Sequence, residues 1–160
     1  MYNQSFFCVR KMAKIRLTKE FRFEMAHALW NYDGLCRNIH GHSYILAVTV
    51  IGAPEMDANN PKYGMVMDFG VLKAIVKEEV VDRLDHAIVV SMNAPTEQLL
   101  SLPQMSERHE VVDYQPTCEN MLIDFAARIK KRMPDNVQLF SLKLNETATS
   151  FAEWYASDND

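Results

Sequence analysis

The sequence predicts an α+β protein, and the spacing of its apolar residues supports this class. Residues 14–27 alternate apolar and polar side chains, as a half-buried strand does, and residues 42–51 have one apolar face that continues from His42. Residues 68–84 and 117–133 instead carry apolar residues at helical spacing. Two shorter strand-like segments close the chain. The order strand, strand, helix, helix, strand, strand favours an antiparallel sheet whose helices are segregated from it.

The first predicted strand has one apolar and one polar face. Its odd positions are apolar with the exception of Lys19, and its even positions are polar or charged from Lys14 to Glu24. His27 ends the apolar face. An isolated histidine at such a position is usually a core residue with a hydrogen-bond partner. Here two further histidines are expected close to His27, which favours a shared site over an isolated core residue.

The second predicted strand carries those two histidines at its start. His40 and His42 are two residues apart, so on a strand both imidazoles point to one face, with Cα atoms roughly 6.5–7 Å apart. If the two strands pair antiparallel, His27 lies beside them. Three neutral imidazoles that leave one position open are typical of a catalytic zinc site. Cys36 would lie in the connection beside that metal.

Both long helices have recognisable starts. Asp68 is the expected N-cap of the first, and Pro116-Thr117 opens the second. The residues between the helices are too many for a bare loop, so we expect a short helix at 97–101 and a short strand at 111–114.

Asp85 and His86 follow the first predicted helix directly. A carboxylate next to an imidazole is either a polar helix end or a proton-transfer pair, since histidine titrates near neutrality and a carboxylate can orient it. The sequence by itself favours the first interpretation.

Glu146 ends the apolar face of the predicted strand 137–146, and a short aromatic strand follows at 151–155. A carboxylate at such a position either turns to water or belongs to a functional site. We expect one domain over residues 13–155, a disordered or non-native extension at 1–12, and a loose acidic tail at 156–160.

Composition excludes several classes of function. The chain has 160 residues, 48% of them hydrophobic and 24% charged, with a formal net charge of −4 and no basic block, which gives no support for nucleic-acid binding. No apolar run approaches the length of a transmembrane helix. Three widely spaced cysteines do not suggest a disulfide framework, so we expect a cytoplasmic protein.

Five motifs occur in an order that resembles the 6-pyruvoyl tetrahydropterin synthase / 6-carboxytetrahydropterin synthase family. They are His27, Cys36-x-x-x-His40-Gly41-His42, Leu84-Asp85-His86, Pro116-Thr117-x-Glu119-Asn120 and Asn145-Glu146-Thr147. The resemblance covers residues 13–155. It implies the tunnelling fold (T-fold), in which a four-stranded antiparallel sheet has two helices on one face. Sheets of three subunits close a barrel in this family, and two trimers stack into a homohexamer.

The resemblance also implies a role for each motif in the conversion of 7,8-dihydroneopterin triphosphate. Zinc would be bound by the three histidines, and Cys36 would be the general base. Asp85 and His86 of a neighbouring subunit would move the second proton. The pterin would be anchored by Glu146, with Thr117 and Glu119 nearby.

The spacing within the cysteine–histidine motif resembles one branch of the family. Three residues separate Cys36 from His40, as in the 6-carboxytetrahydropterin synthases of queuosine and 7-deazapurine synthesis, which also release acetaldehyde. The pyruvoyl synthases resemble this chain less, because their spacing is longer. A folate-linked branch carries glutamate near the cysteine position. The stretch from Ser91 to Pro116 is longer here than in the shortest relatives.

Two other kinds of function stay open at this point. Cys36 and the three histidines could form a closed structural zinc site in an interaction module, although structural sites usually use more thiolates. The fold could also bind a pterin or purine without turnover.

Overall fold

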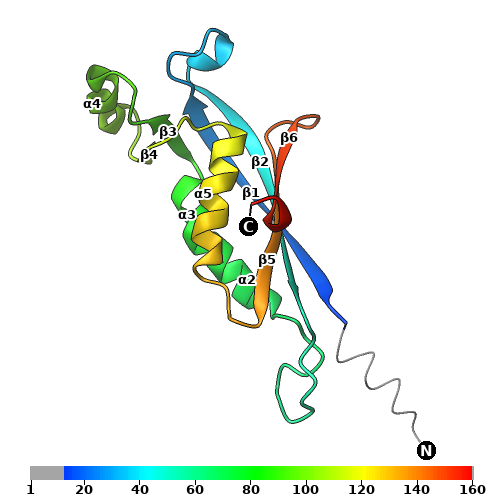
Figure 1. Ribbon diagram of the computed structural model, residues 1–160. Helices are drawn as coiled ribbons and strands as arrows, with labels where there is room; N and C mark the ends of the chain where they lie inside the picture. The colour runs from blue at the N-terminus through cyan, green and yellow to red at the C-terminus, as the bar shows by residue number, and fades with distance from the viewer. Residues whose placement is uncertain (1–12, 160) are drawn as a thin grey trace, which may run out of the picture.

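Six strands form one curled sheet in the part of the chain that the computed structural model describes, residues 13–159 (Figure 1). The strand order is β4-β3-β1-β2-β5-β6. Their bounds are Ile15–Ala28 (β1), His40–Gly52 (β2), Ala87–Ser91 (β3), His109–Val112 (β4), Val137–Asn145 (β5) and Phe151–Tyr155 (β6).

Four of these strands confirm the expected antiparallel sheet. β1 pairs with β2, β2 with β5 and β5 with β6, each antiparallel. Two additional parallel strands extend it, since β3 pairs with β1 and β4 with β3, so the whole sheet is mixed. β3 is not among the predicted strands, β4 begins two residues earlier than predicted, and α4 (Thr96–Met105) is longer than predicted. The long segment before Pro116 therefore contains a strand, a helix and a strand.

The β1–β2 pair confirms the alternation. It runs in register from Ile15 opposite Gly52 to His27 opposite His40. The apolar face of both strands is buried, and it includes Phe23, Met25 and Tyr44. Because one face is buried and the other polar, a slip of one residue would expose the whole apolar set, which fixes the register.

The first long helix has a widened turn in its middle. α2 (Phe69–Val76) continues through a π-helical turn, η2 (Lys77–Val81), into α3 (Asp82–Leu84). Asp68 is its N-cap as predicted, with Oδ1 accepting a hydrogen bond of 2.7 Å from the Gly70 amide. The extra residue of the π turn lets the apolar stripe face the sheet on both sides of it. Val71 is apolar but exposed, so it lies outside the buried stripe.

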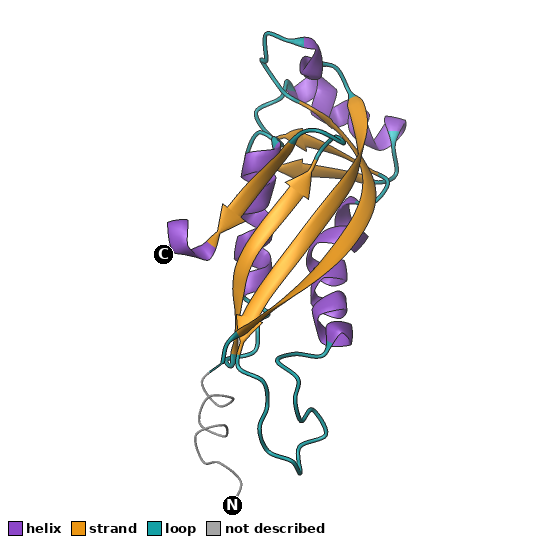
Figure 2. Ribbon diagram, turned by 90° about the vertical axis from the view of Figure 1, so that its right-hand side faces the viewer, coloured by secondary structure: helices purple, strands orange, loops and turns teal. Residues whose placement is uncertain are grey.

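The second long helix, α5 (Cys118–Lys130), packs on the same face of the sheet as α2 (Figure 2). Thr117 is its N-cap, and its hydroxyl accepts from the Asn120 amide at 3.4 Å. One face of α5 is buried in the core, through Met121, Leu122, Phe125, Ala126 and Ile129. Arg132, just beyond α5, forms ion pairs with Glu78 and Glu79 of the π turn. The core thus lies between the sheet and these two helices.

The remaining segments are short. A 3₁₀ turn, η3 (Ala156–Asp158), follows β6 where we expected a loose tail. The predicted extension at 1–12, with Cys8, lies outside the described residues. No helix within residues 13–159 is long and apolar enough to cross a membrane.

Candidate metal centre and active site

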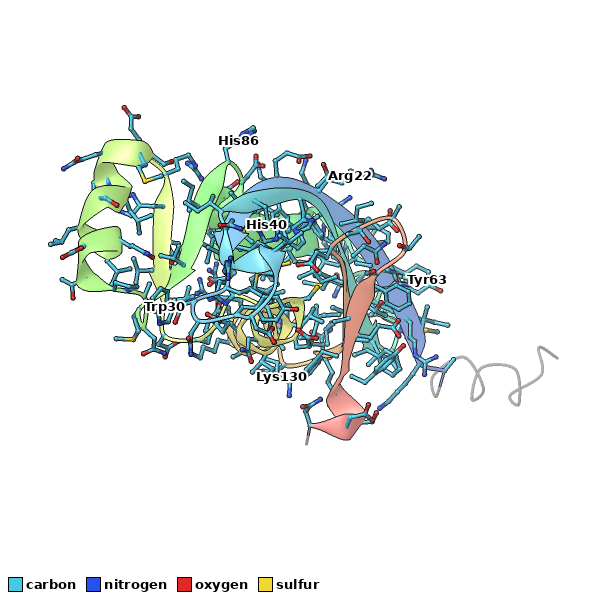
Figure 3. The ribbon with its side chains drawn as sticks, turned by 90° about the horizontal axis from the view of Figure 1, so that it is seen from above. Arg22, Trp30, His40, Tyr63, His86 and Lys130 are labelled. Atoms are coloured by element: carbon cyan, nitrogen blue, oxygen red, sulfur yellow. The ribbon has the colours of Figure 1, made fainter. Side chains whose placement is uncertain are left out.

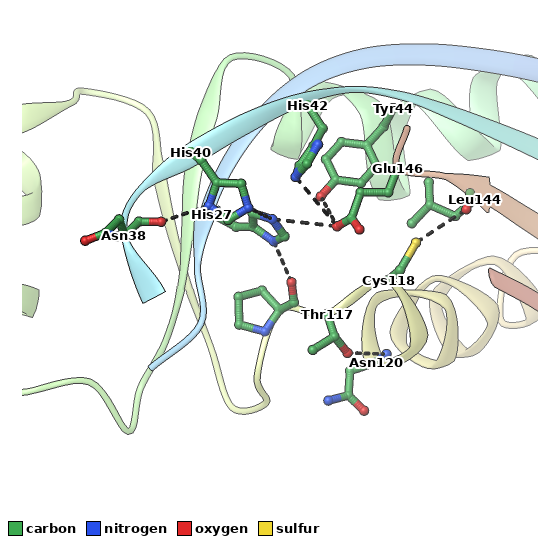
Figure 4. Close-up of polar contacts among 11 residues, drawn as sticks. His27, Asn38, His40, His42, Tyr44, Thr117, Cys118, Asn120, Leu144 and Glu146 are labelled. Carbon is green, nitrogen blue, oxygen red and sulfur yellow. Dashed lines mark hydrogen bonds and ion pairs between the residues drawn. The ribbon is translucent and has the colours of Figure 1, made fainter. Parts of the chain in front are cut away.

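Three histidines meet where β1 ends and β2 begins. His27 and His40 are directly opposite in the β1–β2 register, and His42 follows two residues later on the same face. Their candidate ligand nitrogens all lie within 4.8 Å of one another (Figure 4). The convergence expected from the spacing is therefore present. It is produced by the antiparallel pairing of two strands whose buried faces both end in histidine.

Backbone carbonyls orient two of these rings. Nδ1 of His27 lies 2.7 Å from the Pro116 carbonyl oxygen, and Nδ1 of His40 lies 2.8 Å from that of Asn38. A carbonyl oxygen can only accept, so each Nδ1 carries the proton and donates it. In the neutral rings each Nε2 therefore presents a lone pair.

The arrangement of these lone pairs fits a bound cation. The Nε2 atoms of His27 and His40 are 3.1 Å apart, and two lone pairs at that distance repel unless positive charge lies between them. Nε2 of His42 is buried and has no hydrogen-bond partner among the described residues. Imidazole ligands suit zinc, copper, iron and nickel, so the donor set fits the zinc that the family resemblance implies.

Burial keeps the central imidazole neutral. His27 is 2% exposed, and its burial lowers its pKa below the ordinary value of 6.5, a shift that His40 and His42 reinforce. A proton then competes less with a metal for Nε2 at neutral pH.

Glu146 faces the histidine cluster from the end of β5. Its Oε1 lies 3.7 Å from Nε2 of His27 and 3.8 Å from Nε2 of His42. The same oxygen accepts a hydrogen bond of 3.2 Å from the hydroxyl of Tyr44. Tyr44 is 1% exposed, and its ring meets those of His27 and His42 edge-on. The alternation alone places Tyr44 in the core; its position two residues after His42 on the same face was the available signal of a second role.

Cys36 lies in the connection between the two strands. It belongs to a 3₁₀ turn, η1 (Leu35–Arg37), and its carbonyl accepts a hydrogen bond of 2.9 Å from the Leu29 amide, which folds the connection back over the end of β1. Its thiol is half-buried and free. Within residues 13–159, the group close enough to share a metal contains the three histidines and not Cys36. This geometry counts against a structural site closed by Cys36 as the fourth ligand.

The second described cysteine is in a different environment. Cys118 is buried in the first turn of α5, and its thiol donates to the Leu144 carbonyl at 3.3 Å. Burial, reinforced by the charge of Glu146, raises its pKa to about 12. It stays protonated at physiological pH and is unsuited to act as a base.

The structure does not bring Asp85 and His86 to the histidine cluster within one chain. The His86 amide donates to the Glu24 carbonyl at 2.6 Å, and the Glu24 amide donates to Oδ1 of Asp85 at 2.9 Å. Glu24 belongs to the polar face of β1, whereas His27 belongs to the buried face. The His86 side chain is 74% exposed and lies at the outer edge of the molecule, apart from His40 (Figure 3). Its φ of 60° is a left-handed conformation that is unusual for a residue with a side chain and is often found at functional sites.

Thr117 and Glu119 are at the start of α5, next to the histidine cluster. Thr117 caps the helix and directly follows Pro116, whose carbonyl orients His27. Glu119 is exposed in the first helical turn.

Arg108 supports the turn that carries Asp85 and His86, and no sequence motif singles it out. Its guanidinium donates to the carbonyl of Asp85 at 2.9 Å and to that of Asp82 at 2.6 Å. These carbonyls end α3, where helical partners are missing. The long segment before Pro116 thus braces the Asp85–His86 turn.

Replacing Arg108 by methionine should loosen this turn. The variant keeps the aliphatic stem but leaves two carbonyls without charged donors, so the free energy of unfolding should fall by about 1 kcal/mol. Hydrogen exchange of the His86 amide should become faster. Lys73→Met, on the exposed side of α2, is the matched control. Unchanged exchange at His86 in Arg108→Met would contradict the bracing role.

Comparison with known proteins identifies relatives over almost the whole chain. A family model described as 6-pyruvoyl tetrahydropterin synthase matches residues 16–157. A Haemophilus influenzae protein named 6-carboxy-5,6,7,8-tetrahydropterin synthase is 34% identical over 141 residues, which cover 87% of this chain and 97% of the relative. An Aquifex aeolicus protein of the same name is 30% identical over 166 residues, covering 88% and 98%.

Solved structures share the fold. A crystal structure of an uncharacterized protein from Wolinella succinogenes superposes with a TM-score of 0.73 at 21% identity, covering 90% of this chain and 99% of that one. The 6-pyruvoyl tetrahydropterin synthase of Caenorhabditis elegans superposes with a TM-score of 0.65 at 23% identity, covering 91% and 98%. The likeness includes the curled sheet and the helices on one face.

Proposed function

The chain belongs to the 6-pyruvoyl tetrahydropterin synthase family, and we propose that it is a zinc-dependent 6-carboxy-5,6,7,8-tetrahydropterin synthase. This lyase would convert 7,8-dihydroneopterin triphosphate to 6-carboxytetrahydropterin and release triphosphate and acetaldehyde. Its product would serve queuosine and 7-deazapurine synthesis. The names of the two relatives and the Cys36–His40 spacing support this branch. The observation that carries the proposal is the convergence of three histidine ligand nitrogens within 4.8 Å of one another, with a carboxylate oxygen facing two of them.

His27, His40 and His42 would hold the zinc. When bound, zinc would polarise the side-chain oxygens of the substrate and so acidify its hydroxyl and carbon-bound protons. Two carbonyls fix the rings of His27 and His40, so the ligand nitrogens need little rearrangement.

Cys36 would act as the general base. A thiolate is an effective proton acceptor, and nearby positive charge such as a bound metal favours the thiolate form. Cys36 is half-buried in the connection that leads into His40, whereas Cys118 is buried in the core, and this supports Cys36 as the base.

Asp85 and His86 would move the second proton in the active site of a neighbouring subunit. Their attachment to the backbone of Glu24 supports this, because Glu24 points to the face of β1 opposite to the buried face that carries His27. β4 and β6 are the outer strands of the sheet, and open edges are commonly covered by other chains. Both points favour the family's homohexamer of two stacked trimers.

Glu146 would anchor the pterin, with Thr117 and Glu119 nearby. A carboxylate can accept two N–H bonds from the 2-amino pyrimidinone edge in bidentate geometry. Glu146→Gln should raise KM by about ten-fold or more, since hydrogen bonds to a charged group contribute about 1.5–3 kcal/mol. Initial rates against substrate concentration measure this, with the exposed Glu153→Gln as control. An unchanged KM would count against the anchor.

Mass analysis of the pterin product, together with assays for acetaldehyde and triphosphate, tests the function. We expect 6-carboxytetrahydropterin and equimolar acetaldehyde from 7,8-dihydroneopterin triphosphate. A pyruvoyl product without acetaldehyde would place the chain in the pyruvoyl branch of the family. No release of triphosphate by zinc-loaded protein would remove the enzymatic proposal and leave a pterin-binding protein.

A further inference from the structure

We propose that Glu146 is a fourth, displaceable ligand of the metal in the substrate-free protein. This inference rests on the metal site of the proposed function and adds a second role for the carboxylate that would anchor the pterin. In the empty site one Glu146 oxygen would occupy the position that the substrate later takes.

The first support is that hydrogen-bond acceptors converge on one point. Hydrogen bonds to carbonyls place the protons of His27 and His40 on Nδ1, so both Nε2 atoms are acceptors. A carboxylate oxygen faces the Nε2 atoms of His27 and His42. These three acceptor atoms cannot satisfy one another, and the Tyr44 hydroxyl supplies a proton to only one of them. Nε2 of His42 is buried beside them without a hydrogen-bond partner among the described residues. A cation held between the histidines and the carboxylate would satisfy the acceptors and could bind the His42 nitrogen as well.

The distances come close to those of a four-coordinate site. With zinc bonds of about 2.0–2.2 Å, neighbouring ligand atoms of a tetrahedron are roughly 3.3–3.5 Å apart. Oε1 lies 3.7 and 3.8 Å from two of the nitrogens, and two of the nitrogens lie 3.1 Å apart. Glu146 lies outside the group whose candidate ligand atoms are all within 4.8 Å of one another, so its side chain would have to rotate to reach the ion. That side chain is 28% exposed, so it is not locked by packing.

Tyr44 supports this position without locking it. Its hydroxyl donates to Oε1, the oxygen that faces the histidines, and not to Oε2. At 3.2 Å this bond is longer than most hydrogen bonds between two oxygens, which span roughly 2.5–3.0 Å, and it is therefore easily exchanged. Groups that donate to a metal-binding carboxylate orient it and tune its affinity.

One carboxylate cannot bind the metal and the pyrimidinone edge at the same time. Entry of the pterin would therefore move Glu146 from the metal to the pterin, and substrate oxygens would replace it at the vacated position. The empty enzyme would exclude other small ligands, because any of them would have to displace Glu146.

Binding of imidazole to the Co²⁺-substituted, substrate-free protein tests this, followed by visible absorption. Imidazole is neutral, so charge repulsion from Glu146 does not alter its binding. Glu146→Gln should bind imidazole about ten-fold or more tightly than the wild type. Glu153→Gln, which removes an exposed carboxylate of β6, should match the wild type. Equal imidazole affinity in Glu146→Gln and the wild type would overturn the proposal.

A tyrosine pair provides a second measurement. Tyr44→Phe should weaken zinc binding by about ten-fold in competition with a chromophoric chelator. Tyr114→Phe removes a similar phenol, whose hydroxyl donates a hydrogen bond of 2.7 Å to Asp124 and not to a residue of the histidine cluster. This variant should leave zinc affinity unchanged. Equal effects of the two variants would contradict a specific role of Tyr44.

A crystal structure of the zinc-loaded, substrate-free protein decides the point directly. It should show a Glu146 oxygen about 2.0–2.2 Å from the ion. A water at that position, with Glu146 turned away, would overturn the inference. These measurements involve no turnover, so they separate this inference from the proposed reaction. Ligation by Glu146 can be found in a protein that releases no triphosphate, and a protein that releases triphosphate can lack ligation by Glu146.

Discussion

Cys36→Ala should lower kcat by about 10²–10⁴-fold while the protein keeps its zinc, because a positioned general base contributes a factor of this size. The thiol is half-buried in η1 and is not one of the group that could share a metal. Its removal therefore takes away a proton acceptor and leaves the three nitrogens unchanged. Single-turnover rates with 7,8-dihydroneopterin triphosphate, together with zinc analysis of the same preparation, measure both effects.

Cys118→Ala is the matched control for this prediction. Its thiol is buried and its pKa is raised to about 12, so it is not deprotonated under assay conditions. The variant should retain kcat, with some loss of stability from the small cavity. If Cys36→Ala instead lost stoichiometric zinc, the thiol would be a ligand, and the closed structural site would gain support over the general base.

His42→Ala should lower zinc occupancy well below one per chain and, with it, turnover. Catalytic zinc sites usually keep three protein ligands, and the variant would retain two histidines and only the displaceable Glu146; the lost ligand is a buried Nε2 without another partner among the described residues. The fold should persist, since His42 lies at the start of β2 outside the apolar core. Inductively coupled plasma mass spectrometry gives the zinc content, and far-ultraviolet circular dichroism checks the fold.

His109→Ala controls for the loss of an imidazole as such. The His109 ring lies 3.0 Å from the Ser106 carbonyl and is not in the metal cluster. The His109→Ala variant should therefore bind zinc like the wild type.

In the wild type, zinc should be released as the pH falls, because protons compete for the ligands. The lowered pKa of His27 shifts that release to lower pH than a histidine of ordinary pKa at this position would give. Full zinc occupancy in His42→Ala would disprove the three-histidine site.

The sequence was sufficient for the paired strands and the histidine cluster. In β1 and β2 the burial of every second residue is visible as alternation, and His27, His40 and His42 continue it on one face. Two consecutive strands that pair antiparallel are placed relative to each other once their register is known, and the apolar pattern determines that register. The N-caps at Asp68 and Thr117 were also predictable, because capping depends on local sequence.

What the sequence could not show depends on contacts between distant segments. β3 is a short apolar run paired with β1 in parallel, and such a run has no alternation to identify it. Arg108 binds carbonyls of residues far from it in the chain, and Tyr44 reaches Glu146 across the sheet. The adjacent positions of Asp85 and His86 in the sequence do not reveal that both residues form hydrogen bonds with the backbone of Glu24 in β1.

The π turn between α2 and α3 has a consequence for insertions and deletions. A π turn absorbs one extra residue, so removing one residue from Lys77–Val81 would restore a regular turn and leave the following residues in their present phase. Each α-helical residue adds about 100° of rotation, so removing one from the regular turns of α2 would instead rotate everything after it relative to the sheet. Leu84 would leave the core, and the loop with His86 would swing off the strand to which its amide is tied. The length of this helix thus sets the direction in which the Asp85–His86 pair points, and homologous chains of different helix length would have to compensate for it elsewhere.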